Sequence, residues 1–250
     1  MTDSATAVNG ARARIGTSGY QYPHWKGRFY PADLSKKRWF EHYVHEFDTV
    51  EINNTFYKLP AGKTFAQWRE AAPPGFEFAL KFSRYGSHIK RLRDPREPIE
   101  RFLAVADELG PTLGPILVQL PPKWHANTER LDDFLAAAPA GHRWAIEFRD
   151  QSWLNEEVFA VLENHGAALC IHDMIERHPR RLTAGWTYLR YHGDHYAGSY
   201  SSQFLGAEAK RIVEWLDNGI DVHAFFNNDE DAHAPDNACT LRRLIRKRLG

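Results

Sequence analysis

Short apolar runs recur along the chain, and each run ends in polar residues. Within a run the apolar side chains occupy alternate positions, which is typical of a β-strand. Eight such runs are predicted as strands, over residues 14–20, 49–57, 77–84, 116–121, 143–150, 167–173, 186–193 and 221–229. Helical patterns fill most of the gaps between them, because apolar residues there recur three and four positions apart.

This alternation of strand and helix over 250 residues predicts an α/β fold, a (β/α)8 TIM-type barrel. A doubly wound open sheet is the alternative, but no glycine-rich dinucleotide-binding motif follows any of the strands. The segment between Asp173 and Trp186 is short and broken by proline, so the sixth crossover helix is predicted to be irregular or missing. Residues 1–13 are predicted to form a disordered leader, and residues 14–250 a single TIM-barrel domain.

Polar side chains gather on one face of the predicted strands. One alternate set in each run is apolar and should pack on helices, whereas the other set becomes polar toward the C-terminal end of the strand. This second set comprises Glu51, Asn53, Lys81, Gln119, Glu147, Arg149, His172, Arg190, His192 and Asn227. Barrel enzymes carry their active sites at that end of the strands.

Two interpretations of this polar set are open: a network of paired charges that specifies packing, or an active site. Desolvation offsets much of the attraction within a buried ion pair, so such a network would add little stability. Perturbed titratable groups, in contrast, concentrate at active sites. The functional interpretation is therefore favoured.

Composition narrows the functional classes. The chain is 43% hydrophobic and 26% charged with a formal net charge of zero, which fits a soluble globular protein and excludes polyanion binding by bulk charge. Cys170 and Cys239 are the only cysteines, which argues against a disulfide scaffold and a structural zinc cluster. No signal peptide or membrane-spanning run is present, so a cytoplasmic location without a membrane partner is expected. The oligomeric state is not predicted.

Several motifs together resemble the YecE-like family, also called domain of unknown function 72. They are "GTSGY", "TVEINNTFY", "FALK", "LGPILVQLPP", "AIEFRDQSW", "YLRYHG" and "FFNND", and the similarity runs from about Ile15 to the C-terminal helix. The resemblance implies a TIM-type barrel without an established reaction. It adds Tyr57 and Asn228 to the candidate residues.

The favoured hypothesis is a hydrolase-like enzyme for an anionic substrate, such as a phosphate ester, a phosphosugar or a nucleic-acid fragment. Glu51 or Glu147 would be the general base, and His172 or His192 the acid. The substrate-binding residues would be Asn53, Tyr57, Lys81, Gln119, Arg149, Arg190, Asn227 and Asn228. The basic loop from Arg84 to Arg96 could steer a polyanion, or it could be an ordinary solvated loop.

Three alternatives remain. A glycosidase-like enzyme would use Glu51 and Glu147 as paired carboxylates. A metal-dependent hydrolase or isomerase could use these with His172, Asp173 and His192, but no metal-binding motif is present and the nearby cations disfavour a metal, so neither metal nor cofactor is predicted. A non-catalytic module for nucleic acid or protein would use the basic loop and the basic C-terminal helix.

Overall fold

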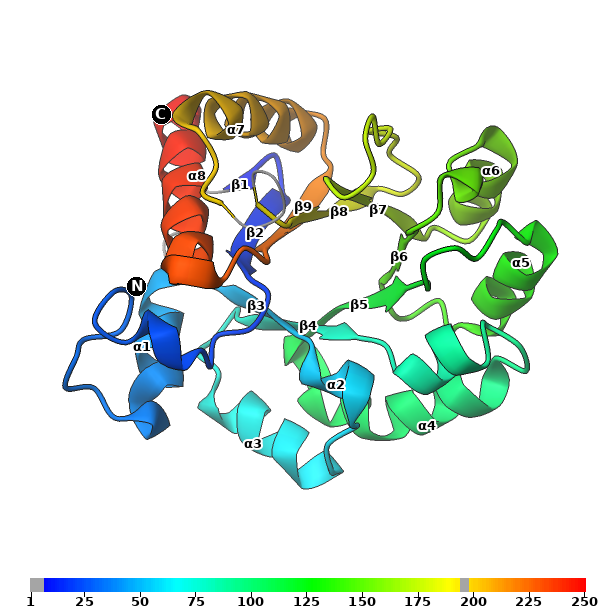
Figure 1. The fold of residues 1–250 in the computed structure, drawn as a ribbon, viewed down its shortest axis with the longest axis horizontal. Coiled ribbons are helices and arrows are strands. Elements are labelled where there is room, and N and C mark those ends of the chain that lie inside the picture. Colours follow the sequence, from blue (N-terminus) through cyan, green and yellow to red (C-terminus); the bar gives the residue numbers. More distant parts are fainter. Residues whose placement is uncertain (1–6, 194–197) are drawn as a thin grey trace. The chain divides into compact units, whose positions relative to one another are not determined.

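The computed structural model describes residues 7–193 and 198–250. The chain divides into two compact units. Unit 1 holds the chain through Glu51 together with Leu189–Gly250, drawn in blue and in orange to red in Figure 1. Unit 2 holds Ile52–Tyr188 and is drawn in cyan to yellow. The chain passes between the units inside two strands, after Glu51 and after Tyr188.

Strands and helices alternate along the described residues, which confirms the predicted α/β fold. The strands are β1 (Ala7–Val8), β2 (Ala11–Thr17), β3 (Thr49–Ile52), β4 (Glu77–Lys81), β5 (Leu113–Gln119), β6 (Trp144–Glu147), β7 (Ala168–His172), β8 (Trp186–Tyr191) and β9 (Asp221–Phe226). Each of the eight predicted runs overlaps one of the strands β2 to β9. The closed (β/α)8 barrel and the single domain over residues 14–250 stay predictions.

The helices follow the strands in the expected order. They are α1 (Trp39–Glu46), α2 (Asn54–Tyr57), α3 (Gly62–Ala71), α4 (Arg96–Ala106), α5 (Thr128–Ala137), α6 (Glu156–Asn164), α7 (Ser202–Asp217) and α8 (His233–Leu249). A short π-helix, η3 (Tyr85–Ile89), follows β4. Among the described residues, no helix combines the length and the apolar character needed to cross a bilayer.

The sixth crossover contains no helix, as predicted. Residues 173–185, between β7 and β8, form bends and turns. Thr183 holds this segment against β7: its Oγ1 donates to the Ala167 carbonyl at 2.7 Å and accepts from Leu169 N–H at 2.8 Å. The buried Thr183 hydroxyl therefore satisfies two backbone groups, at Ala167 and Leu169, and fixes the irregular segment to β7.

Residues 7–13 differ from the predicted disordered leader. β1 pairs with β2 in antiparallel register, with Ala7 opposite Arg12. The turn between them is Asn9-Gly10, and both residues have positive φ, at 52° and 87°. Asn-Gly is the preferred pair for this kind of hairpin turn, so the signal was present in the sequence. Residues 1–6 of the predicted leader lie outside the described residues.

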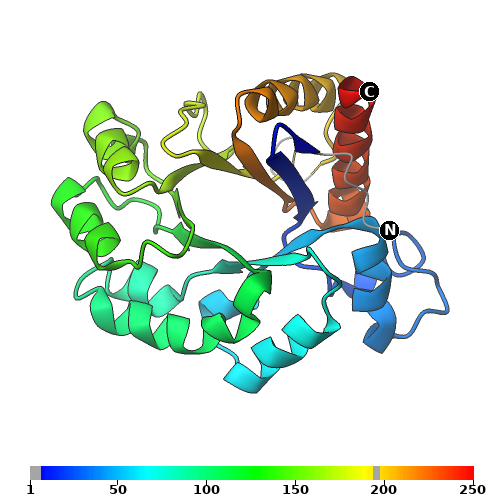
Figure 2. The ribbon, with the colours of Figure 1, turned by 180° about the vertical axis from the view of Figure 1, so that it is seen from behind.

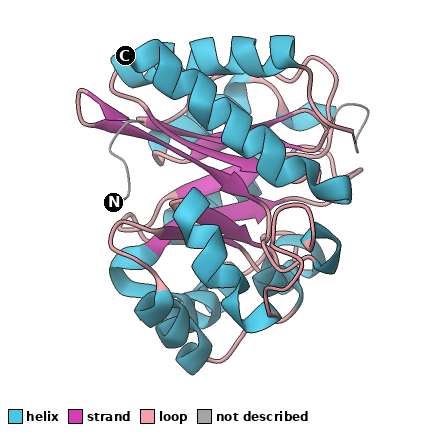
Figure 3. Ribbon diagram, turned by 90° about the vertical axis from the view of Figure 1, so that its left-hand side faces the viewer, coloured by secondary structure: helices cyan, strands magenta, loops and turns pink. Residues whose placement is uncertain are grey.

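Unit 1 is organised around parallel strands covered by two helices. β2 pairs with β9 from Ala13 opposite Val222 onward, and Asn227 N–H donates to the Tyr191 carbonyl at the end of β8. α7 and α8 lie against each other and contact β2 and β9 (Figure 3). β2 approaches β3 so closely that a Cβ on Gly16 would lie 2.3 Å from the Thr49 carbonyl oxygen, so glycine is required there.

Unit 2 contains the parallel strands β4, β5, β6 and β7, each beside the next. The helices α3, α4, α5 and α6 contact one another in that order along the outer side of these strands (Figure 2). Phe82, Phe102, Phe134 and Trp144 join strand and helix layers, with ring centroids 5.1–5.9 Å apart between successive members of the cluster. This apolar packing holds the polar ends of β4, β5 and β6 in place.

Candidate functional site

The two units divide the predicted site residues between them. Unit 1 carries Glu51, Arg190, His192, Asn227 and Asn228, and unit 2 carries Asn53, Tyr57, Lys81, Gln119, Glu147, Arg149 and His172. The alternation of side chains along the strands predicts that both groups of residues form one site, and this stays a prediction. Within each unit, some of these residues form a hydrogen-bonded cluster.

In unit 2, a chain of polar side chains connects the ends of β4, β5 and β6. Lys81 Nζ donates to Gln119 Oε1 at 3.1 Å, and Gln119 Nε2 donates to Glu147 Oε1 at 2.8 Å. Arg149 Nε donates to the same carboxylate oxygen. We call these four residues the β4–β6 site. The hydrogen bonds confirm that Lys81, Gln119 and Glu147 share one face, as predicted.

Local structure explains how this site is built. Parallel register places Gln119 directly opposite Glu147 on neighbouring strands, so their side chains leave the sheet side by side. Glu147 is fully buried and Lys81 is nearly so. A buried carboxylate requires hydrogen-bonding partners, and Gln119 and Arg149 provide them.

Three further residues contact the site. The ring of Phe56 lies 4.5 Å from Lys81 Nζ, close enough for a cation–π interaction. Thr55 Oγ1 lies 2.7 Å from the Lys81 carbonyl oxygen and ties α2 to β4. Arg149 Nη1 donates to Met174 Sδ at 2.6 Å. Thr55 stood within a motif, whereas no sequence signal marked Met174, because its contact depends on the fold of the irregular sixth crossover.

Both ring nitrogens of His172 are engaged by backbone atoms. Nε2 lies 2.7 Å from the Phe148 carbonyl oxygen, and Nδ1 accepts from Met174 N–H at 3.1 Å, so Nε2 carries the proton. Burial lowers the pKa of His172 to about 4, and the nearby Glu147 carboxylate only partly opposes this shift. The geometry favours a positioning role, because His172 bonds to the backbone of Phe148, which precedes Arg149, and of Met174, which Arg149 contacts.

Two of the four side chains of the β4–β6 site are cations. These are Lys81 and Arg149, and Glu147 is a carboxylate. His88, which lies on η3, is close enough to be affected by these cations. Burial lowers its pKa to about 4, and the positive charges of Lys81 and Arg84 contribute to this shift. An anion would be attracted to such a site.

His172 predicts a pH dependence of stability. Its pKa in the folded protein, about 4, lies below the usual value of 6.5, so the unfolded chain binds the extra proton. The contribution of His172 to the free energy of unfolding should therefore be fully present above about pH 6.5. It should decrease as pH falls toward 4, by up to about 1.4 kcal/mol per pH unit. Urea unfolding at about pH 7 and about pH 5 should show a smaller pH effect in His172→Gln than in the wild type. Equal pH effects would contradict this prediction.

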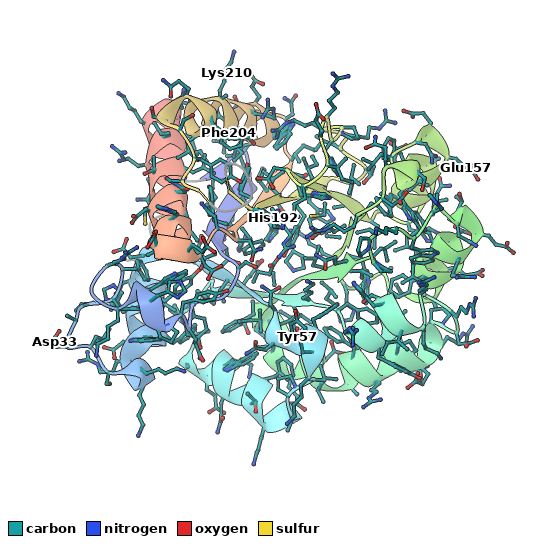
Figure 4. The ribbon with its side chains drawn as sticks, in the orientation of Figure 1. Asp33, Tyr57, Glu157, His192, Phe204 and Lys210 are labelled. Atoms are coloured by element: carbon teal, nitrogen blue, oxygen red, sulfur yellow. The ribbon has the colours of Figure 1, made fainter. Side chains whose placement is uncertain are left out.

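In unit 1, Glu51 and Arg190 form a buried ion pair. Arg190 Nη2 donates to Glu51 Oε1 at 2.8 Å and lies 3.3 Å from Ser18 Oγ. Ser18 Oγ donates to the same carboxylate oxygen. His192 follows β8 (Figure 4), and its Nε2 lies 3.4 Å from Arg190 Nη1. Within this pair the two formal charges offset each other.

Asn228 helps to hold the chain before α7. Its Nδ2 donates to the Gly198 carbonyl and to Asn237 Oδ1, both at 3.0 Å. Asn237 also accepts from Tyr200 N–H at 3.1 Å. Asn227 contributes its backbone N–H to the bond with β8 described above. Through these contacts the two asparagines connect segments of unit 1, which is a structural role.

The remaining predicted residues lie at α2. Asn53 precedes this helix, and its carbonyl accepts from Phe56 N–H at 3.1 Å. Tyr57 ends the helix and is 77% exposed (Figure 4). Across residues 7–193 and 198–250, no group of three or more His, Cys, Asp or Glu side chains is arranged to hold a metal ion.

Comparison with known proteins places the chain among relatives of similar length. A model of the family described as "Protein of unknown function DUF72" matches residues 14–249. The UPF0759 protein YunF of Bacillus subtilis is 23% identical over 260 residues, covering 86% of this chain and 89% of that protein. The crystal structure of the DUF72 family protein TM1631 from Thermotoga maritima has a TM-score of 0.83 and 27% identity, and the match covers 93% of this chain and 98% of that chain.

A sugar-converting enzyme shares the fold at lower similarity. The crystal structure of D-psicose 3-epimerase, solved in the presence of D-fructose, has a TM-score of 0.55 and 12% identity, covering 94% of this chain and 96% of that chain. This likeness shows the fold alone, and it is of the TIM-barrel-like kind.

Proposed function

The chain belongs to the DUF72 family of proteins of unknown function, and from this premise we propose that it is a hydrolase-like enzyme for a small anionic substrate. The observation that carries the proposal is the β4–β6 site, where a fully buried carboxylate lies between a neutral amide and an arginine, with a lysine beyond. Two of its four side chains are cations, and burial makes the attraction of a cation for an anion stronger than it would be in water.

Lys81 and Arg149 would bind the anionic group. A guanidinium offers several N–H donors in a plane that matches phosphate or carboxylate oxygens, and the ammonium adds a compact charge. Gln119 would hold Lys81 and Glu147 at a constant separation, since it bonds to both. A phosphate ester, a phosphosugar and a nucleic-acid fragment share the group that this arrangement would recognise.

Glu147 would be the general base. In the reaction we propose, Glu147 accepts a proton from a water molecule as the water oxygen forms a bond to phosphorus. The ester P–O bond breaks, and the leaving oxygen takes the proton that Glu147 accepted, which gives the alcohol and returns Glu147 to its carboxylate form. Gln119 and Arg149 keep the carboxylate in the orientation that proton transfer requires.

A glycosidase-like reaction has weaker support. Such a reaction requires one carboxyl group to be protonated so that it can act as the acid. Glu51 accepts a hydrogen bond from Arg190, and Glu147 accepts one from Arg149. Each arginine stabilises the ionised form of its partner, so neither carboxyl group is arranged as an acid.

Lys81→Met should weaken anion binding. The change retains most of the side-chain volume but removes the positive charge and the bond to Gln119. Because a hydrogen bond to a charged group contributes about 1.5–3 kcal/mol, the Kd for inorganic phosphate should rise by roughly 10- to 100-fold. Isothermal titration calorimetry would measure it. Lys210→Met, which removes an exposed charge on α7 (Figure 4), is the control and should bind phosphate as the wild type does.

The reaction itself would be sought with phosphate monoesters, phosphate diesters and sugar phosphates, by following release of phosphate or alcohol. Turnover that Lys81→Met abolishes and Lys210→Met retains would support the proposal. Phosphate binding that is equal in all three proteins would overturn the assignment of the site.

A further inference from the structure

One surface of unit 2 carries exposed aromatic and apolar side chains. Among the described residues, the large hydrophobic side chains that are exposed are Tyr57, Ile89 and Tyr85, at 77%, 64% and 38%. They lie on α2 and η3, which are in contact, because the Phe56 ring packs against His88 at 4.9 Å. Solvent-exposed aromatic residues that cluster in this way are typical of a binding surface.

Arginines are interleaved with these side chains. Residues 84–93 contain four Lys and Arg residues and no acidic residue. Lys90 lies near Asp94 and Glu97, at 3.5 and 3.7 Å, and is therefore partly neutralised. The remaining three, Arg84, Arg91 and Arg93, are exposed, and none of them forms an ion pair with a residue that the structure describes. We call these three arginines with Tyr57, Tyr85 and Ile89 the tyrosine–arginine surface.

The loop that carries two of the arginines is held in a strained conformation. Arg91, Leu92 and Asp94 have positive φ, at 48°, 64° and 44°, which is unfavourable for residues other than glycine. The Leu92 side chain is buried and its N–H donates to the Gly86 carbonyl at 3.0 Å, so the loop is fixed to η3. Backbone strain of this kind is concentrated at functional sites.

We propose that the tyrosine–arginine surface binds single-stranded nucleic acid. Tyrosine rings offer stacking faces to unpaired bases, and exposed arginines bind the phosphates between them. A lipid surface is less well matched, since Ile89 is the one aliphatic member and the other five are aromatic or cationic.

The surface adjoins the β4–β6 site. Phe56 contacts the Tyr57 ring at 4.9 Å, and its own ring lies under Lys81 Nζ. A strand bound on Tyr57 would therefore have a phosphate close to Lys81. This last step, in which the strand is the substrate, rests on the proposed function, whereas binding to the surface does not.

Fluorescence anisotropy with a labelled oligothymidylate of roughly 12 nucleotides, a length typical of such sites, tests the proposal with the full chain. Tyr57→Ala should weaken binding by about tenfold or more, because one base loses its stacking partner. Changing Arg84, Arg91 and Arg93 together to Gln should reduce the slope of log K against log salt by about 2. Thermal unfolding of each variant would show that it is folded.

A matched control changes Lys210 on α7 and Arg243 and Lys247 on α8 to Gln, which alters the net charge by the same amount as the triple arginine variant. An equal loss of affinity in this control would show non-specific attraction and overturn the proposal. Absence of oligonucleotide binding would also overturn it. So would Tyr57-dependent binding to phosphatidylserine vesicles without oligonucleotide binding, which would assign the surface to lipid.

The Lys81→Met variant separates this inference from the proposed function. Suppose that Tyr57 and the three arginines determine the oligonucleotide affinity, while Lys81→Met leaves the Kd for phosphate unchanged. The surface is then confirmed and the proposed site is wrong. If phosphate binding depends on Lys81 but the surface variants bind the oligonucleotide normally, the proposed site stands and this inference fails.

Discussion

Glu147→Gln is expected to lower turnover of a phosphate ester by about 10²- to 10⁴-fold, because it removes the proposed general base without changing the size of the side chain. The amide can still accept from Gln119, so the strand ends should stay in place. Loss of the negative charge removes a carboxylate that competes with the anion for Arg149, and the affinity for inorganic phosphate should be retained or increased. The expected signature is a large fall in kcat with an unchanged or lower Kd for phosphate.

Steady-state kinetics and calorimetry together would measure these two effects. Glu157→Gln makes the same chemical change on the exposed face of α6 (Figure 4) and should leave both quantities unchanged. If Glu147→Gln lowers kcat less than about tenfold in a protein that binds the ester, Glu147 is not the base. A loss of phosphate binding together with turnover would instead indicate that the carboxylate organises the two cations.

Glu51→Gln is expected to destabilise the protein by about 3–5 kcal/mol, because it leaves the Arg190 charge buried without its carboxylate. Both members of the pair are buried, and the guanidinium lies 2.8 Å from the carboxylate oxygen. For a chain of this size the melting temperature should fall by roughly 6–20 °C, which calorimetry would detect. A loss within the error of the measurement would show that Arg190 finds other compensation.

An exposed ion pair provides the control. Glu41 and Arg38 bond at 2.9 Å on the surface of α1, and Glu41→Gln should change the melting temperature very little, because solvent screens the pair. A double variant, Glu51→Leu with Arg190→Met, should be more stable than Glu51→Gln alone, since neither of these two positions then carries a buried charge. If the double variant is the less stable, the polar cluster is required for packing in its own right.

The alternation of side chains was sufficient to predict much of the fold. Period two in the apolar runs identified all eight strands from β2 to β9, and the proline-broken segment after Asp173 predicted the missing helix. The hairpin at residues 7–13 was missed because these residues are few and weakly apolar, although Asn9-Gly10 carried the local signal. Strands and tight turns depend on residues that are close together in the sequence, which is why a local pattern can predict them.

The candidate site was predictable as residue types and faces, but not as contacts. Parity placed Lys81, Gln119 and Glu147 on one face, and their hydrogen bonds confirm it. Parity could not show that both nitrogens of His172 bond to backbone, because that depends on the path of the next loop. A histidine expected to be an acid thus has the geometry of a positioning residue.

The sequence by itself determined which strands form and which side chains share a face, since both follow from periodicity along a few residues. Only the tertiary structure decided the register that sets Gln119 opposite Glu147, the contact of Arg149 with Met174, and the exposure of Tyr57. Each of these depends on segments far apart in the chain, whose packing is a property of the whole fold. The proposed site therefore depends on contacts between strand ends that no local pattern specifies.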